Sequence, residues 1–143
     1  MSASAQPLTI PHAIEPAART RYGVAVSALL VAAFSLSVIH TVYARLSGLE
    51  DPDFTVTSPL TWVFYLVAFG AAALARRDSR AAQMTVLGYL VVILGVSVFY
   101  YPTTFTLEQQ TTFGWFENDV YTGLLLTSLI LSVLRLRRRA LVP

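Results

Sequence analysis

The chain has 143 residues, of which 55% are hydrophobic and only 13% charged, and its mean hydropathy is +0.61. This composition is too apolar for a water-soluble domain of that size, because the hydrophobic residues form long blocks and leave no polar face between them. The absence of cysteine excludes disulfides, thiolate metal sites and thiol catalysis. We therefore predict an all-α integral membrane protein with a single domain.

The first 21 residues contain three prolines and no helical period, which predicts a flexible cytoplasmic tail. The first uncharged apolar segment spans residues 22–43, long enough for a hydrocarbon core that needs roughly 20 helical residues. A cleaved signal peptide is the alternative, since Val42 and Ala44 imitate a cleavage site. The apolar block exceeds an ordinary signal core of about 7 to 15 residues, so we predict a retained helix.

Two further spans are predicted over residues 58–75 and 81–101. Ser58 and Pro59 favour a helix start, because serine caps free backbone amides and proline is tolerated at the first helical position. The connection between these spans is so short that it predicts an antiparallel helical hairpin. The outer loops are expected over residues 44–57 and 102–115.

The fourth span is predicted over residues 116–134, although only its last 15 residues are uncharged. Its start therefore lies in the headgroup region. In the preceding loop, Thr106 and Gln109 have capping-box spacing, which predicts a short amphipathic segment along the outer membrane surface. The membrane domain as a whole covers residues 22–135, followed by a basic cytoplasmic tail over 136–143.

The arginines predict the orientation of the bundle, because basic residues near a span are retained in the cytoplasm. Nine of the ten flank the predicted inner ends: Arg19, Arg21, Arg76, Arg77, Arg80, Arg135, Arg137, Arg138 and Arg139. Only Arg45 lies outside, whereas six of the eight acidic residues fall in the two outer loops or at the outer start of the fourth span. Both termini are thus expected in the cytoplasm. The use of arginine without any lysine is typical of GC-rich, actinobacterium-like genomes, which predicts a bacterial inner membrane.

Two interpretations are open for the polar residues that begin the fourth span. Glu117, Asn118 and Asp119 resemble a helix cap, since such side chains accept hydrogen bonds from free amides and suit the helix dipole. They also resemble a cation or proton site, with His40 at matching depth in the first span. The sequence favours capping, and His40, Glu117 and Asp119 stay the weaker metal candidates.

No catalytic, phosphate-binding or dinucleotide-binding motif is recognised in the sequence, so no cofactor is assigned. Small and hydroxyl residues such as Gly123 and Thr127 are typical of helix packing in membranes. We expect an accessory or scaffolding subunit that binds other membrane proteins or itself, and no nucleic acid. The expected outer-face interaction residues are Trp115, Phe116, Glu117, Asn118 and Asp119. The alternatives are a small transporter or channel formed by oligomerisation and, less favoured, a metal-dependent membrane enzyme.

Overall fold

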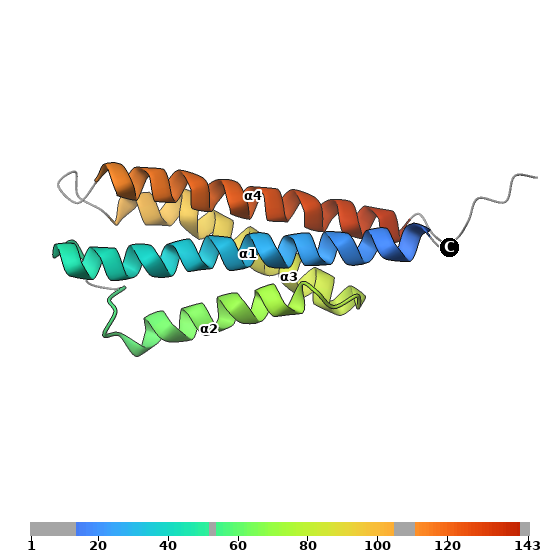
Figure 1. Cartoon of the computed structure of the whole chain (residues 1–143), viewed down its shortest axis with the longest axis horizontal. Helices are drawn as coiled ribbons and strands as arrows, with labels where there is room; N and C mark the ends of the chain where they lie inside the picture. Colours follow the sequence, from blue (N-terminus) through green and yellow to red (C-terminus); the bar gives the residue numbers. More distant parts are fainter. Residues whose placement is uncertain (1–13, 52–53, 105–110, 141–143) are drawn as a thin grey trace, which may run out of the picture.

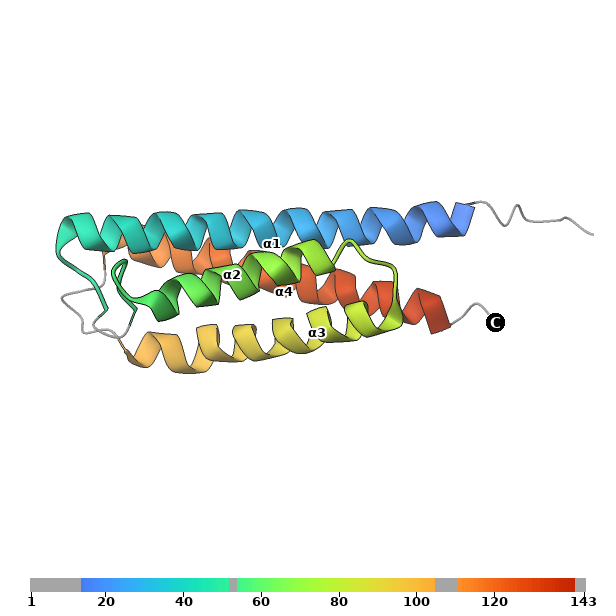
Figure 2. The same ribbon diagram turned by 90° about the horizontal axis from the view of Figure 1, so that it is seen from below.

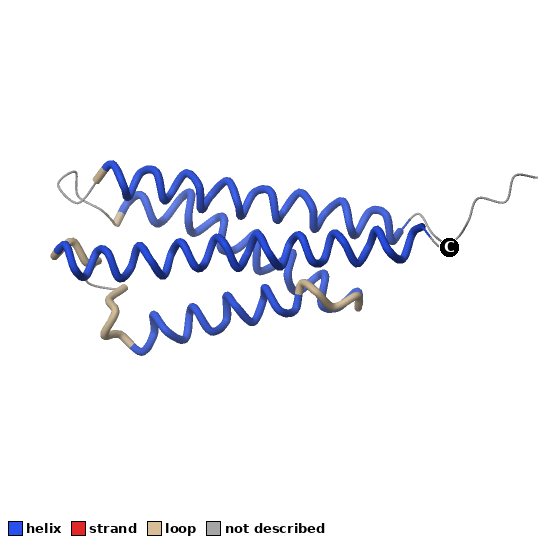
Figure 3. Tube along the Cα trace, in the orientation of Figure 1, coloured by secondary structure: helices blue, strands red, loops and turns tan. Residues whose placement is uncertain are grey.

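A computed structural model describes residues 14–51, 54–104 and 111–140, with side chains from residue 21 to 138 within these ranges. The described part of the chain contains no strand and is built from four α-helices (Figures 1 and 3). These are α1 (Ile14–Ser47), α2 (Pro59–Leu74), α3 (Arg80–Gly95) and α4 (Thr112–Ala140). Helix α3 continues into a π-helical turn, η1 (Val96–Tyr100), and a 3-10 turn, η2 (Tyr101–Thr103).

The four helices run lengthwise beside one another in a bundle (Figures 1 and 2). Helix α1 packs most extensively against α4 and next against α2, whereas α2 and α3 make less contact with each other. The start of α1, the α2–α3 turn and the end of α4 lie at one end of the bundle, which we call the basic end (Figure 2). The α1–α2 connection, the η turns and the start of α4 lie at the opposite, acidic end.

The core is centred on Phe34 of α1, which is fully buried. Its ring meets those of Phe64, Phe69 and Tyr121 edge-on, at centroid distances of 6.1, 6.3 and 5.9 Å. Such edge-to-face contacts are favourable because the positive ring edge meets a negative face. Buried alanines along α1 and α2 let the two backbones approach closely.

Within the described ranges, three helical segments are long and apolar enough to cross a membrane: Arg21–Ser47, Arg80–Thr103 and Thr112–Arg138. Helix α2 has 16 residues and a length of about 24 Å, short of a typical hydrocarbon core. Large apolar side chains are exposed along it, including Leu66 at 74%. The prediction of a helical membrane protein is confirmed at this level.

Two predicted boundaries differ from the structure. The expected tail over residues 1–21 is helical from Ile14 onward. Pro16 is compatible with this because it lies in the first turn, where a backbone amide has no helical partner, and alanines follow it. Helix α4 extends beyond the predicted 116–134 in both directions. The predicted capping box of the amphipathic segment lies outside the described residues.

Candidate functional site

Helix α4 begins at Thr112 because Thr111 caps it. The Thr111 hydroxyl accepts a hydrogen bond from the backbone amide of Gly114 at 3.0 Å, and its carbonyl accepts one from Trp115 at 3.0 Å. Residues 117–119 therefore lie inside the helix, beyond its first turn. The interpretation of these residues as the helix cap is wrong, since the free amides of α4 precede them.

The polar residues at 117–119 point to different sides of α4. Glu117 is buried at 4% exposure, Asn118 is half-buried, and Asp119 is exposed. This separation follows from helix geometry, because residues two positions apart lie on nearly opposite faces. The predicted outer-face residues divide in the same way: Trp115 and Phe116 are exposed at 55% and 61%, together with Asp119, whereas Glu117 faces the bundle.

The structure brings His40 of α1 and Glu117 of α4 together, as their matching depth predicted. Nδ1 of His40 lies 3.5 Å from Oε2 of Glu117, within ion-pair range but longer than a typical hydrogen bond. The imidazole stacks on Phe113, with centroids 6.2 Å apart and planes inclined by 11°. Asp119 does not join this pair, and within the described residues no three metal-binding side chains of His, Cys, Asp or Glu come together.

A cavity of about 240 Å³ lies beside this pair, and we call it the outer cavity. Its walls come from all four α-helices, the η turns and the α1–α2 connection. They include Ser37, His40, Thr41, Ser97, Glu117 and Tyr121. A second cavity of about 150 Å³ touches His40 as well and is lined by Tyr43, Trp115 and Asn118 among others. His40 and the buried carboxylate of Glu117 thus line the outer cavity together with apolar and hydroxyl side chains.

The η1 turn provides part of the wall of the outer cavity. A π-helical turn widens the helix by one residue relative to α-helical hydrogen bonding, and such turns recur at functional sites. Ser97 is buried in this turn and donates a hydrogen bond to the carbonyl of Ile93 at 2.8 Å. Pro102 in the following turn has no amide to donate, which helps to end the helix.

Hydroxyl groups join α1 to α2 beside the outer cavity. The Tyr65 hydroxyl lies 2.6 Å from Oγ1 of Thr41 and 3.2 Å from Oγ of Ser37. Thr41 in turn donates to the Ser37 carbonyl at 3.0 Å, so the tyrosine acts as donor to Thr41. Satisfied hydroxyl contacts of this kind fix the relative position of neighbouring helices.

The α1–α2 connection is organised around Glu50. Its Oε2 accepts a hydrogen bond from the Arg45 guanidinium at 2.7 Å, and its Oε1 accepts one from the Val56 amide at 3.2 Å. The Arg45 hydrogen bond, more than the Val56 bond, holds the pKa of Glu50 below its ordinary value. Trp62 then donates through Nε1 to the Val56 carbonyl at 2.8 Å. The one arginine predicted on the acidic side is thus paired locally.

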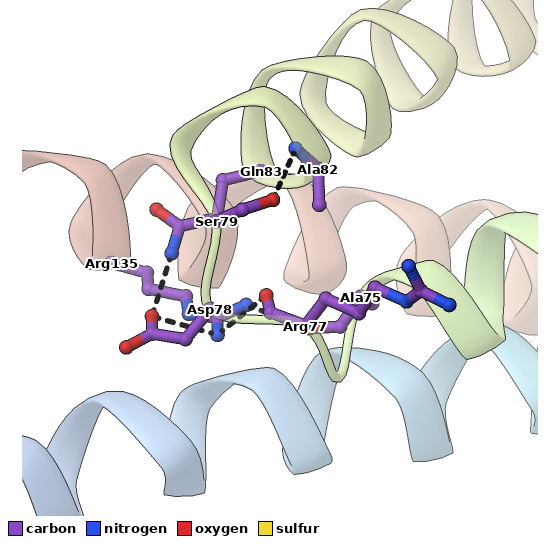
Figure 4. A network of polar contacts seen from close by, with 7 residues as sticks. All are labelled: Ala75, Arg77, Asp78, Ser79, Ala82, Gln83 and Arg135. Atoms are coloured by element: carbon purple, nitrogen blue, oxygen red, sulfur yellow. Dashed lines mark hydrogen bonds and ion pairs between the residues drawn. The ribbon is translucent and has the colours of Figure 1, made fainter.

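A polar network closes the basic end of the bundle (Figure 4). Arg135 of α4 is buried at 4% exposure and donates to the carbonyls of Ala75 and Arg77, at 2.7 and 3.1 Å. It also meets Oδ1 of Asp78 at 3.3 Å, which accepts a hydrogen bond from Gln83 at 2.9 Å. A cation suits these carbonyls because the C-terminus of a helix carries partial negative charge. Arg135 was predicted only as a topology residue.

Comparison with known proteins yields no match to any family model, curated protein or solved structure.

Proposed function

We propose that this chain is a four-span protein of a bacterial plasma membrane, with both termini in the cytoplasm, that serves as an accessory subunit of a larger membrane complex. The orientation is supported by the gathering of nine of the ten arginines near the basic end. In this proposal α2 also crosses the membrane, as a shorter span than the other three, and the flanking residues 58 and 75–79 reach into the headgroup layers.

The observation that carries the subunit role is Asp119. It is exposed on α4, seven residues after Thr112, and therefore about 10 Å along the helix from its start. The same exposed face continues through Gly123 and Thr127, whose hydroxyl folds back onto the Gly123 carbonyl at 2.8 Å. A carboxylate among lipid-facing residues is costly unless a partner compensates it.

The occupant that suits this face is a transmembrane helix of another protein with a basic or hydrogen-bond-donating side chain near its outer end. Charge complementarity with Asp119 selects this chemistry. A second copy packed symmetrically on the same face would bring two Asp119 carboxylates together, which is unfavourable. The space at Gly123 allows close approach, because a Cβ there would have no described atom within 4 Å.

The test is mild detergent extraction from the native membrane, followed by mass analysis of the proteins that co-purify in stoichiometric amounts. We expect Asp119→Asn and Gly123→Leu to lose the partner while the chain stays folded. Gly88→Leu is the matched control, since Gly88 is also an exposed helical glycine with no described atom within 4 Å of its Cβ position. Retention of the same partner by all three variants would contradict the proposal.

The transporter or channel alternative has one supporting observation, the outer cavity beside Glu117. It is distinguished by reconstituting the purified chain alone into liposomes. Solute flux or conductance without any other protein would favour this alternative over the accessory subunit.

A further inference from the structure

We propose that the outer cavity binds the ammonium group of an organic cation. The argument is independent of the accessory-subunit proposal, because it concerns the inward face of α4, whereas Asp119 lies on the outward face. The ligand is defined by its chemistry: a positive charge carried on an apolar, alkyl-substituted nitrogen.

The first step concerns size. The outer cavity has a volume of about 240 Å³. Cavities need only about 10–15 Å³ to hold one water, and an engineered apolar cavity of about 150 Å³ binds benzene. The outer cavity therefore has room for an organic group of several heavy atoms, far more than a bare metal ion requires.

The second step concerns charge. The Glu117 side chain is 6% exposed, and its one polar contact within the described residues is His40 at 3.5 Å. Nδ1 of His40 is itself buried and forms no hydrogen bond with any described group. Asp51 adds a second carboxylate to the wall. No arginine is found among the described residues that line the cavity, so its polar groups favour a cation and disfavour an anion.

The third step concerns the walls. Phe54, Phe64, Tyr100 and Tyr121 all line the cavity. Phe54 and Phe64 meet edge to face, with centroids 5.4 Å apart and planes inclined by 82°. Aromatic walls around a carboxylate suit an alkylammonium group, since the ring faces attract the charge and the alkyl groups replace water. A hydrated metal ion would gain little from such walls and would require more oxygen ligands than Glu117 provides.

The experiment titrates the purified full-length chain in detergent with tetramethylammonium chloride, against sodium chloride at equal ionic strength, by calorimetry. We expect saturable binding of tetramethylammonium alone. Glu117→Gln should weaken the affinity about tenfold or more, because it removes a desolvated charge. Asp119→Asn is the matched control: it removes the same charge two residues away, outside the cavity, and should leave the affinity within about twofold.

Phe54→Leu provides a second variant in case Glu117→Gln does not fold. It keeps an apolar side chain in the connection but removes the aromatic face, so we expect a severalfold loss of affinity. The proposal is overturned if tetramethylammonium shows no saturable binding to the wild-type chain. It is also overturned if folded Glu117→Gln and Phe54→Leu both bind like the wild type.

A further arm distinguishes a free amine from a lipid headgroup, which present the same ammonium chemistry. Native mass spectrometry would compare the lipid that stays bound to the protein after release from nanodiscs that contain either phosphatidylethanolamine or phosphatidylglycerol. A lipid headgroup is identified if the chain selectively retains phosphatidylethanolamine, if tetramethylammonium displaces this lipid, and if the Glu117→Gln variant does not retain it. Tetramethylammonium binding without lipid retention identifies a free ligand, and both results support the site.

Discussion

Arg135 in the last helix donates a hydrogen bond of 2.7 Å to the backbone carbonyl of Ala75, 60 residues earlier. The guanidinium is thereby bound to the end of α2. This helix has 16 residues, the same number as α3. This arginine differs from its neighbours Arg137 and Arg138, which are exposed. Its charge does more than add to the basic end of the bundle, because it joins α4 to the α2–α3 turn.

Replacing Arg135 with Met should destabilise the folded chain by roughly 1–3 kcal/mol, because two carbonyls and Asp78 lose a buried donor while the apolar stem is kept. Unfolding in detergent micelles, followed by circular dichroism, measures the effect. Arg137→Gln is the control and should change stability by less than about 0.5 kcal/mol, since Arg137 is exposed. Equal effects of the two variants would show that the Arg135 contacts do not stabilise the bundle.

Gly23→Ala should also destabilise the bundle, by roughly 1–3 kcal/mol, because the added methyl group would overlap its surroundings. A Cβ at Gly23 would lie 2.9 Å from the Ala75 carbonyl oxygen and 2.9 Å from Cζ of Arg135. Gly70→Ala is the matched control in α2, where no described atom lies within 4 Å of the added carbon. It should stabilise the helix by about 0.5–1 kcal/mol, and a cost as large as that of Gly23→Ala would refute the packing argument.

The start of α4 can be tested with Thr111→Val and Asp119→Ala. Loss of the Thr111 hydroxyl should cost about 0.5–2 kcal/mol of stability, because the Gly114 amide loses its acceptor. Asp119→Ala should cause no loss, since Asp119 lies within the helix and alanine has the higher helix propensity. The same unfolding assay measures both variants. A larger loss of stability for Asp119→Ala than for Thr111→Val would indicate that the helix begins at residues 117–119.

The Glu50 contacts predict an acid-sensitive connection between α1 and α2. The pKa of Glu50 is lowered from its ordinary value of 4.5, chiefly by the Arg45 hydrogen bond. A lowered pKa in the folded state means that the stabilisation is present above the ordinary value and is lost as the pH falls through the lowered one. Trp62 fluorescence should therefore change on acidification below about 4.5 in a Trp115→Phe background.

Glu50→Gln in that background should abolish this fluorescence titration, because glutamine does not ionise. A transition of unchanged midpoint and amplitude in the variant would assign the pH dependence to another group. The Glu50 side chain is 16% exposed, and its partners Arg45 and Val56 lie close to it in the chain, so we expect a local change in the connection without loss of the bundle.

The proposed orientation predicts the behaviour of topology reporters. A reporter fused after Pro143 should be active only in the cytoplasm, and activity outside would refute the four-span arrangement. Replacing Arg76, Arg77 and Arg80 with Gln should lower the yield of correctly inserted protein, because the α2–α3 turn loses its retention signal. Unchanged yield and orientation would mean that the tails alone determine topology.

The helices themselves were predictable, because uncharged apolar runs of this length have few other stable structures in water or lipid. Their ends were less so. Asn118 and Asp119 are frequent capping residues, and this local preference masked the weaker signal of Thr111, whose hydroxyl is the observed cap. Secondary-structure preferences at helix ends are easily overruled when an earlier residue also provides an acceptor.

The candidate site was predictable only in part. His40 and Glu117 could be paired because both were predicted near the outer ends of spans, and depth constrains contacts in a membrane. The sequence predicts the rotation of each helix about its axis less accurately than its depth. It therefore did not predict that Asp119 points away from the His40–Glu117 pair. Arg135 was missed for another reason: its partners at residues 75 and 77 are main-chain carbonyls, which every residue type possesses.

The close packing of α1 against α4 has a consequence for biogenesis, because α1 is synthesised before α2, α3 and α4. Until α4 is synthesised, the buried face of α1 lacks its largest partner, and the α2–α3 turn lacks the Arg135 guanidinium. Helices α1, α2 and α3 should therefore form a loosely associated intermediate until then. Completion of the last helix converts that intermediate to the closed bundle in one late step, so chains truncated before Arg135 should be preferred substrates for membrane proteases.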